Sequence, residues 1–405
     1  MTSCQSIEKS IESPNENPNT VLQTAKEKSL ALLRCNMTPH GIMAASQSTQ
    51  AEHRRYTRIF GRDAAICALG MIASGDAELA DNAVSGLINL AEHQADNGQI
   101  PKYITPSSNE ADFWYLGCID ATLWWLIAIK FTARWLPDAA IEQRLEQNIN
   151  RAIVWLHCQE HPHLRLLQQN EASDWADIMP RSGFVLYSNA LWFYVKQLYG
   201  MPYQQETRFH FNHLFCPFSR DLPDYHRLRL LMHYVRNKTK NGDLYLSFVN
   251  FSFWGDEGDV FGNILAVLFG LAGHSRAERI LDTLGKTGVN HPYPIRSVCT
   301  PITKDHLLWR PYMQRHRQNL EFCYHNGGVW PFIGGFWVMA LADAGLKQEA
   351  RAELYKLAQM NRLHDWQFNE WFHGKTGEAC GMPGQSWNAA MYLLASRCLE
   401  EKIFP

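Results

Sequence analysis

Residues 120–135 read DATLWWLIAIKFTARW, and this stretch shows the kind of element from which the chain is built. Asp120 can cap a helix, and the apolar residues behind it span about four helical turns. The most apolar part, Leu123 to Ile129, ends at Lys130 and is much shorter than the roughly 20 apolar residues of a membrane helix. The stretch therefore predicts a buried helix of a globular protein, and we expect no association with a membrane.

Stretches of similar length recur from about Val21 onward, with apolar residues at helical spacing. After the first, they cover residues 63–74, 77–95, 120–135, 139–158, 186–199, 222–236, 258–271, 275–285, 329–345, 347–360 and 385–400. Strand signals are few, and the best of them runs from Leu244 to Phe253. The pattern predicts an all-α fold.

Two all-α architectures fit such a series of helices: a solenoid of repeats and a closed double ring, the (α/α)6 barrel. A solenoid has a sequence period, and none is evident here. Long, aromatic and charged loops alternate with the helices at 97–117, 160–185, 237–257, 286–327 and 362–384. We therefore expect a single (α/α)6 domain over residues 21–405. Residues 1–20, rich in Ser, Asn, Glu and Pro, are expected to form a disordered arm.

Composition excludes several functions. The 38 Lys and Arg nearly balance the 40 Asp and Glu, which argues against binding to nucleic acid. The ten cysteines occur singly, without a CxxC pair, and no signal peptide is recognisable. These features predict a cytoplasmic protein with reduced thiols and no metal site. The sequence leaves the oligomeric state open.

A cluster of carboxylates in the 160–185 loop is the first candidate for chemistry. Glu171, Asp174 and Asp177 surround Trp175 and precede Arg181. Close like charges and an apolar ring raise the pKa of a carboxyl group, as a general acid requires. Spacing alone does not choose among the three acids, and a solvated acidic loop or a helix cap is an equally good interpretation.

Three other segments carry candidate ligand-binding groups. Glu370 lies between aromatic residues in a glycine-rich loop, where an ordinary loop glutamate is the alternative. His325 lies in Tyr-His-Asn-Gly-Gly-Val-Trp-Pro, a pattern that also marks the start of a helix. Arg62-Asp63 and Asp120 stand at expected helix starts, where an aspartate is more often only a cap.

The aromatic content supports a carbohydrate ligand. The chain has 14 Trp, and the motifs for P-loop, Rossmann, HExxH and GxSxG chemistry are absent from the sequence. Glycoside hydrolysis requires two carboxylates and flat rings that stack on sugar faces. We expect Trp175, Trp330 and Trp371 to face one pocket.

Six segments in order resemble the amylo-α-1,6-glucosidase domain of glycogen debranching enzymes and, more loosely, the neutral invertases and related (α/α)6 glycoside hydrolases. They are Gly61-Arg-Asp63, Gly98-Gln-Ile-Pro101, Asp120-Ala-Thr-Leu-Trp124, Trp175-Ala-Asp177 with Pro180-Arg-Ser-Gly183 and Asn189-Ala-Leu-Trp192, Tyr324-His325 to Pro331, and Asn369-Glu370 with Gly384-Gln-Ser-Trp387.

The resemblance implies roles for individual residues and a reaction that uses no cofactor. It makes Asp177 the general acid and Glu370 the general base that activates water. It assigns substrate binding to Arg62, Asp63, Asp120, Trp124, Trp175, Arg181, His325, Trp330 and Gln385. Carboxyl groups about 6.5–9.5 Å apart would leave room for water and lead to inversion.

Departures from the family pattern keep several substrates open. Tyr187 stands where the pattern has Glu, and the second acid of the Glu370 segment is missing. We therefore expect a small α-glucoside or oligosaccharide as substrate, with sucrose, cleaved by a β-fructofuranosidase, as the alternative. A non-catalytic carbohydrate-binding protein is a second alternative, and a sugar epimerase or lyase that uses Tyr324 and His325 is a third.

Overall fold

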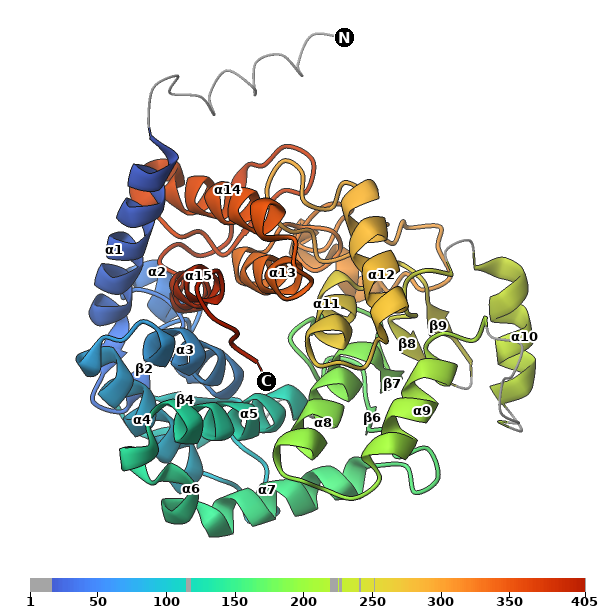
Figure 1. The fold of residues 1–405 in the computed structure, drawn as a ribbon, viewed down its shortest axis with the longest axis horizontal. Helices are drawn as coiled ribbons and strands as arrows, with labels where there is room; N and C mark the ends of the chain where they lie inside the picture. Colours follow the sequence, from blue (N-terminus) through green and yellow to red (C-terminus); the bar gives the residue numbers. More distant parts are fainter. Residues whose placement is uncertain are drawn as a thin grey trace, which may run out of the picture.

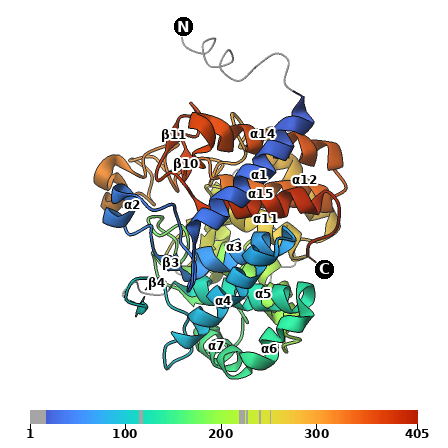
Figure 2. The ribbon, with the colours of Figure 1, turned by 90° about the vertical axis from the view of Figure 1, so that its left-hand side faces the viewer.

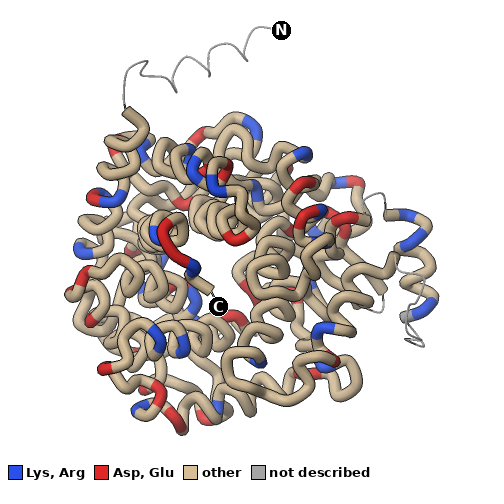
Figure 3. The backbone as a smooth tube through the Cα atoms, viewed as in Figure 1, with Lys and Arg blue, Asp and Glu red and all other residues tan. Residues whose placement is uncertain are grey.

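Helices dominate the computed structural model, which describes residues 17–113, 118–218, 225, 228–239, 242–250 and 252–404. The expected all-α class is confirmed, with short two- to three-residue strands between the helices. Within the described part of the chain, no helix is long and apolar enough to cross a membrane. Acidic and basic residues are interspersed around the fold (Figure 3).

Six helices form a closed inner ring (Figure 1). In chain order they are α3 (Gly61–Ala73), α5 (Ile119–Trp135), α8 (Leu186–Leu198), α11 (Val260–Leu268), α13 (Pro331–Asp343) and α15 (Ser386–Cys398). Each packs against the next, and α15 packs against α3, which closes the ring. Nearly every residue of these helices is buried, because apolar residues lie all round them rather than on one stripe.

Amphipathic helices cover the ring from outside (Figures 1 and 2). They are α1 (Pro18–Asn36), α4 (Ala77–Glu92), α6 (Ile141–Arg144) and α7 (Glu146–Gln159), α9 (Gln204–Leu214), α12 (His274–Lys286) and α14 (Lys347–Trp366). Each buries one stripe; α12, for example, buries Ile280, Leu281 and Leu284. The chain therefore alternates between inner and outer helices. Among the described residues, two further α-helices, α2 (Thr49–His53) and α10 (Leu228–Lys238), and two short 3-10 helices, η2 (Pro137–Ala139) and η3 (Pro311–Arg317), lie outside this series.

The seam between α15 and α3 is tight. A Cβ atom on Gly70 would lie 2.0 Å from the carbonyl oxygen of Ala390, so the two helices touch through the glycine backbone. Asn36, at the end of α1, donates to the carbonyl oxygen of Gly384 and to Ser386 Oγ, both at 2.9 Å. Segments from the two ends of the sequence are therefore joined by close packing and hydrogen bonds.

The short strands lie in the loops before the inner helices. Strands β6 (Gln168–Gln169), β7 (Gly183–Val185), β8 (Phe248–Val249) and β9 (Trp254–Gly255) form one antiparallel sheet. Strands β3 (Ile59–Phe60), β4 (Tyr103–Thr105) and β5 (Glu110–Asp112) form another. Two hairpins pair β1 (Met37–Thr38) with β2 (Gly41–Ile42), and β10 (Trp371–Phe372) with β11 (Ala379–Cys380). These pairings fix the loops at the N-terminal ends of the inner helices.

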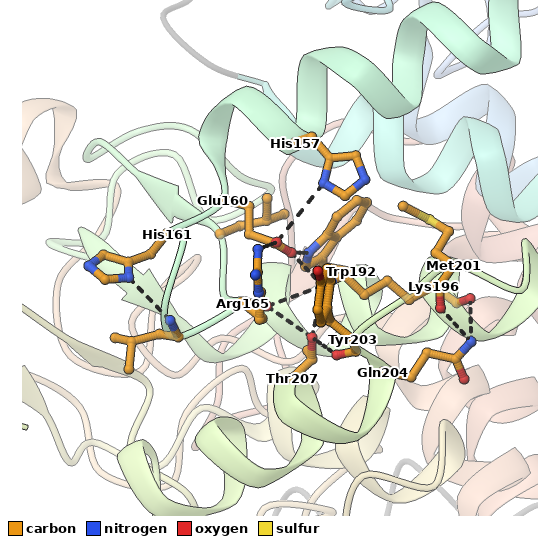
Figure 4. A network of polar contacts seen from close by, with 12 residues as sticks. His157, Glu160, His161, Arg165, Trp192, Lys196, Met201, Tyr203, Gln204 and Thr207 are labelled. Carbon is orange, nitrogen blue, oxygen red and sulfur yellow. Dashed lines mark hydrogen bonds and ion pairs between the residues drawn. The ribbon is translucent and has the colours of Figure 1, made fainter. Parts of the chain in front are cut away.

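A buried lysine of the inner helix α8 joins it to the two outer helices α7 and α9 (Figure 4). The ammonium group of Lys196 in α8 is fully buried, forms an ion pair with Glu160 after α7, and donates to Thr207 Oγ1 of α9 at 2.8 Å. Trp192 Nε1 also donates to Glu160, at 2.7 Å, and the Arg165 guanidinium lies 3.6 Å from the same carboxylate. Every charged group in this cluster has partners, as buried charges require.

Several element boundaries differ from the sequence-based expectations. Helix α1 begins at Pro18 with Asn17 as its cap, so residues 18–20 of the expected arm are helical; residues 1–16 lie outside the described part. The expected strand at 244–253 is reduced to Phe248–Val249. The helix expected at 222–236 appears as Leu228–Lys238, and its first part lies outside the described residues.

Candidate active site

A cavity of about 200 Å³ opens at the N-terminal ends of the inner helices, and we call it the carboxylate cavity. Its lining comprises Tyr56, Phe60, Arg62, Asp63, Lys102, Cys118, Asp174, Trp175, Asp177, Tyr324, His325, Trp330, Glu370, Gln385 and Trp387. Several of these residues precede or begin α3, α5, α13 and α15. The helix N-termini direct positive partial charge toward the cavity, which favours carboxylates and sugar oxygens there.

Glu370 is held rigidly in the wall of this cavity. Tyr56 donates a hydrogen bond to Glu370 Oε1 at 2.6 Å, and the backbone N–H of Met382 donates to Oε2 at 3.0 Å. A Cβ atom on Gly381, whose φ is +76°, would lie 2.5 Å from Glu370 Oε2, so a glycine is required there. Burial raises the pKa of Glu370 to about 7, although the two hydrogen bonds oppose this shift.

Asp177 is more accessible than Glu370. Its side chain keeps 34% of its exposure, and His325 Nδ1 lies 4.0 Å from its Oδ1. Desolvation raises the pKa of Asp177, while the positive charges of Lys102 and Arg62 oppose the shift. Burial, together with Arg181 and Arg62, lowers the pKa of His325 well below its usual value. The imidazole beside Asp177 is therefore neutral near pH 7 and can donate or accept a hydrogen bond.

Arg62 and Asp63 lie in the floor of the cavity, and the buried carboxylate of Asp120 contacts Arg62 from behind. Arg62 Nε donates to Asp63 Oδ1 at 3.1 Å, and Arg62 Nη1 lies 3.4 Å from Asp120 Oδ2. Burial raises the pKa of Asp120 to about 6 and also raises that of Asp63, while Arg62 opposes both shifts. The guanidinium also lies 5.8 Å from the ring centre of Trp387. Arg62 is thus fixed between acids and an aromatic ring.

Aromatic rings pack closely together in the cavity lining, with His325 of this group beside Asp177. The ring of Trp175 is 5.4 Å from that of Trp330 and 5.0 Å from that of His325. His325 stacks on Trp330 at 5.2 Å, and Trp387 meets Trp330 edge-on at 5.9 Å. The result is a rigid aromatic cluster in the lining, which can stack on a sugar ring and exclude water.

Most of the residues predicted from the sequence meet at this cavity. Those that line it are Asp177, Glu370, Arg62, Asp63, Trp175, His325, Trp330 and Gln385. Among the three neighbouring acids, Glu171 points away to Tyr312 and Arg310. Asp174 lines the cavity, but its two oxygens accept from Gln169 and from the Ala176 N–H. Asp177 is therefore better placed than Asp174 to act on a ligand.

Three residues predicted to contact substrate lie behind the cavity instead. Asp120 and Trp124 are fully buried and both bond to the hydroxyl of Tyr187, Asp120 Oδ2 at 3.2 Å and Trp124 Nε1 at 2.7 Å. Arg181 is also buried, with its guanidinium 3.3 Å from Asp259. The side chains of these three residues are buried in the protein interior. They can therefore support the cavity, but they do not line it.

The expectation for Trp371 is also wrong, because this ring packs 5.9 Å from Tyr324 and Trp387 takes its place in the lining. Sequence reasoning also missed Tyr56 and Lys102. Lys102 directly follows the Gly98–Pro101 segment, which was a usable signal, whereas Tyr56 belongs to none of the motifs.

In the ranges that the structure describes, no group of three or more His, Cys, Asp and Glu residues is arranged to hold a metal ion.

The fold is shared with a glycosidase of known structure. The GH63 mannosylglycerate hydrolase from Thermus thermophilus, solved in complex with glucose, superposes with a TM-score of 0.64 at 15% identity. The alignment covers 92% of this chain and 99% of that one. The helical ring of this chain is therefore the fold of that hydrolase.

Sequence comparison points to a narrower group. The pattern of the alkaline and neutral invertases matches residues 242–402, which hold His325, Trp330, Glu370 and Gln385. Cytosolic invertase 1 of Oryza sativa subsp. japonica is 30% identical over 145 residues, which make up 35% of this chain and 25% of that invertase. The alkaline/neutral invertase CINV1 of Arabidopsis thaliana is 21% identical over 431 residues, covering 90% of this chain and 76% of the relative.

These similarities confirm the expected resemblance to neutral-invertase-like (α/α)6 glycoside hydrolases. The alignment to the first rice relative spans about a quarter of that protein's length.

Proposed function

We propose that this chain is a glycoside hydrolase with an (α/α)6 barrel, acting on sucrose or another small α-glucoside. The observation that carries the proposal is the presence of Asp177 and Glu370 in one cavity faced by aromatic rings. Two carboxylates on either side of a glycosidic bond are the usual machinery of such enzymes. The similarity to named invertases supports sucrose as the first substrate to test.

In the proposed reaction, Asp177 donates its proton to the glycosidic oxygen as the bond to the anomeric carbon breaks. Glu370 removes a proton from a water molecule, whose oxygen forms the new bond to that carbon from the opposite face. The leaving sugar departs with the proton of Asp177, and the configuration at the anomeric carbon inverts. Neither a metal nor a cofactor takes part.

Other groups in the cavity would hold the sugar ring. Arg62 and Asp63 offer a fixed donor and acceptor pair to neighbouring hydroxyls. Neutral His325 lies beside Asp177 and can bind a hydroxyl next to the scissile bond. Trp175 and Trp330 supply the apolar wall for the C–H face. Asp120, Trp124 and Arg181 would act indirectly by supporting these residues.

The cavity volume of about 200 Å³ supports a small substrate, because it is below the range of about 300–1,000 Å³ typical of drug-sized ligand sites. A chain end that inserts one sugar residue also fits this size. Amylo-α-1,6-glucosidase specificity, which the sequence motifs suggested, therefore stays in competition with sucrose hydrolysis.

The test is to incubate the purified protein with sucrose or with isomaltose in H₂¹⁸O. The released anomers are then identified by ¹H NMR, and the position of the ¹⁸O label by mass spectrometry. We expect ¹⁸O in the released glucose and β-glucose as the first anomer. Label in fructose would identify a β-fructofuranosidase that binds the fructosyl unit. α-Glucose that carries the ¹⁸O label as the first anomer would contradict inversion, because the label shows that water attacked the glucosyl carbon.

The same panel separates the remaining alternatives. Hydrolysis of isomaltose but not sucrose would favour the amylo-α-1,6-glucosidase activity. Sugar binding without release of reducing sugar, and without change of the sugar itself, would identify a non-catalytic binding protein. Conversion to an isomer or an unsaturated product would identify an epimerase or lyase. A cytoplasmic location and the absence of nucleic-acid partners remain predictions.

A further inference from the structure

A second hollow lies behind the loop that carries Asp174 and Asp177, and we call it the amide groove. Its volume is about 440 Å³, within the range of about 300–1,000 Å³ typical of ligand sites. Its polar lining consists of Gln159, Gln168, Gln169, Asn170, Ser173 and Ser182. Trp155 and Ile119 supply its apolar surface.

The lining is uncharged throughout its described residues. A carboxamide donates and accepts hydrogen bonds side by side, so it matches the neighbouring hydroxyls of a polyol. A charged ligand would find no counter-charge among these groups. The indole of Trp155 provides an apolar surface for the C–H face of a ring. This chemistry fits a neutral, polyhydroxylated molecule.

Part of the groove is preorganised. Gln169 is fixed by a hydrogen bond from Ser188 to its Oε1 and by its own donation to Asp174 Oδ2 at 2.9 Å. Ser182 Oγ accepts from Asn250 Nδ2 at 3.0 Å. The pairing of Gln168–Gln169 with Phe184–Gly183 holds the backbone of this wall. Gln168 and Asn170 are exposed at the rim, where they can turn toward a ligand.

We propose that the amide groove is a second binding site, outside the catalytic centre, for a neutral polyhydroxylated ligand such as a mono- or disaccharide. The groove and the carboxylate cavity share one partition. Gln169 faces the groove and donates to Asp174, which lines the carboxylate cavity. Ser173 faces the groove, and its carbonyl oxygen accepts from the N–H of Ile119, next to Cys118 in the cavity lining. A bound sugar would therefore stiffen the loop that positions Asp177.

The experiment uses ¹⁹F NMR of the full chain labelled with fluorotryptophan, in an Asp177→Asn background that prevents turnover. The signal of Trp155 is assigned by its loss in Trp155→Phe, and those of Trp175 and Trp330 are assigned in the same way. Glucose and sucrose are then titrated separately. We expect the Trp155 signal to shift with its own saturation curve, distinct from that of the Trp175 and Trp330 signals.

The variant Gln159→Ala with Asn170→Ala removes two groove amides and should weaken the Trp155 response roughly tenfold or more. The matched control is Gln348→Ala, an exposed glutamine at the start of α14, which should leave the response unchanged. Signals of the other tryptophans report whether each variant is folded.

A Trp155 signal that does not move with either sugar, or that moves equally in the double variant, overturns the proposal. If the carboxylate cavity did not bind these sugars, as the proposed function requires, the outcome would look different. In that case the Trp175 and Trp330 signals would stay still, while the Trp155 response and its loss in the double variant would persist.

Discussion

Two buried acids in this protein have opposite surroundings. Glu160, outside the ring, is nearly covered by the ammonium of Lys196, the indole N–H of Trp192 and the guanidinium of Arg165 (Figure 4). Glu370, in the carboxylate cavity, has hydrogen bonds from Tyr56 and Met382 but no cation within ion-pair distance among the described residues. The first site neutralises its charge, whereas the second holds an acid whose pKa is raised to about 7.

The difference is that between a structural ion pair and the proposed catalytic carboxylate. A buried pair with full hydrogen bonding is destabilised by loss of either partner, because the remaining charge is left in the interior. A carboxylate without a cation costs stability when it ionises, but it binds protons near neutral pH, as acid–base catalysis requires. The following predictions test this division.

The largest effect is expected from the acids of the cavity. Asp177→Asn and Glu370→Gln should each lower kcat by about 10²–10⁴, because each removes one proton transfer. Circular dichroism should remain that of the wild type. The measurement is initial rate on the substrate identified by NMR. Full activity in either variant would refute its catalytic role, and Gln348→Ala should match the wild type.

The structural pair should respond in stability rather than in activity. Lys196→Met leaves Glu160 without its main partner, and we expect a loss of about 3–5 kcal/mol in the free energy of unfolding. Urea titration measures this, while kcat of the folded enzyme should hardly change. The double variant Lys196→Met with Glu160→Leu removes both charges and should regain much of the loss. A Lys196→Met variant as stable as the wild type would contradict the structural role of the Lys196–Glu160 ion pair.

Stability should rise when the charge of Glu370 is removed. The native pKa of about 7 exceeds the ordinary value of 4.5, so the unfolded state releases this proton first as pH rises. The loss of unfolding free energy caused by the buried charge of Glu370 is absent well below pH 4.5. It grows as the pH rises from 4.5 to 7 and is complete above pH 7. Glu370→Gln should therefore be about 1–3 kcal/mol more stable than the wild type at pH 8. The gain should vanish at pH 4, and an equal gain at both pH values would exclude titration of Glu370 as its cause.

The smallest effect concerns the position of the acid limb in the pH–rate profile. As the proposed base, Glu370 must be ionised, so activity should rise with pH through about 7. The hydroxyl of Tyr56 stabilises the carboxylate, and Tyr56→Phe should move the midpoint of this limb upward by on the order of one pH unit. Above the new midpoint, kcat should recover most of its value. A lowered plateau with an unmoved midpoint would show that Tyr56 has another role.

The inner ring could be predicted from the sequence because its helices are apolar almost all round, as in residues 120–135. Helix α9 was missed because Gln204–Leu214 buries only Thr207, Phe211 and Leu214, which gives a weak apolar pattern. The motifs located most of the cavity lining, yet they did not show that Asp120 and Arg181 turn away from it. Tyr56 could not be predicted, because its partner Glu370 lies 314 positions away and local sequence patterns do not show such contacts.

The seam between α3 and α15 has a consequence for how the chain acquires its structure. Tyr56, Arg62 and Asp63 belong to one side of the seam, and Glu370, Gln385 and Trp387 belong to the other. A ribosome makes the two sides hundreds of residues apart, so the ring cannot close until α15 has emerged. During that interval the apolar faces of α3 and α13 lack their neighbour, a state in which nascent chains aggregate or recruit chaperones. Assembly of the carboxylate cavity thus coincides with closure of the ring, and enzymatic activity would report that closure.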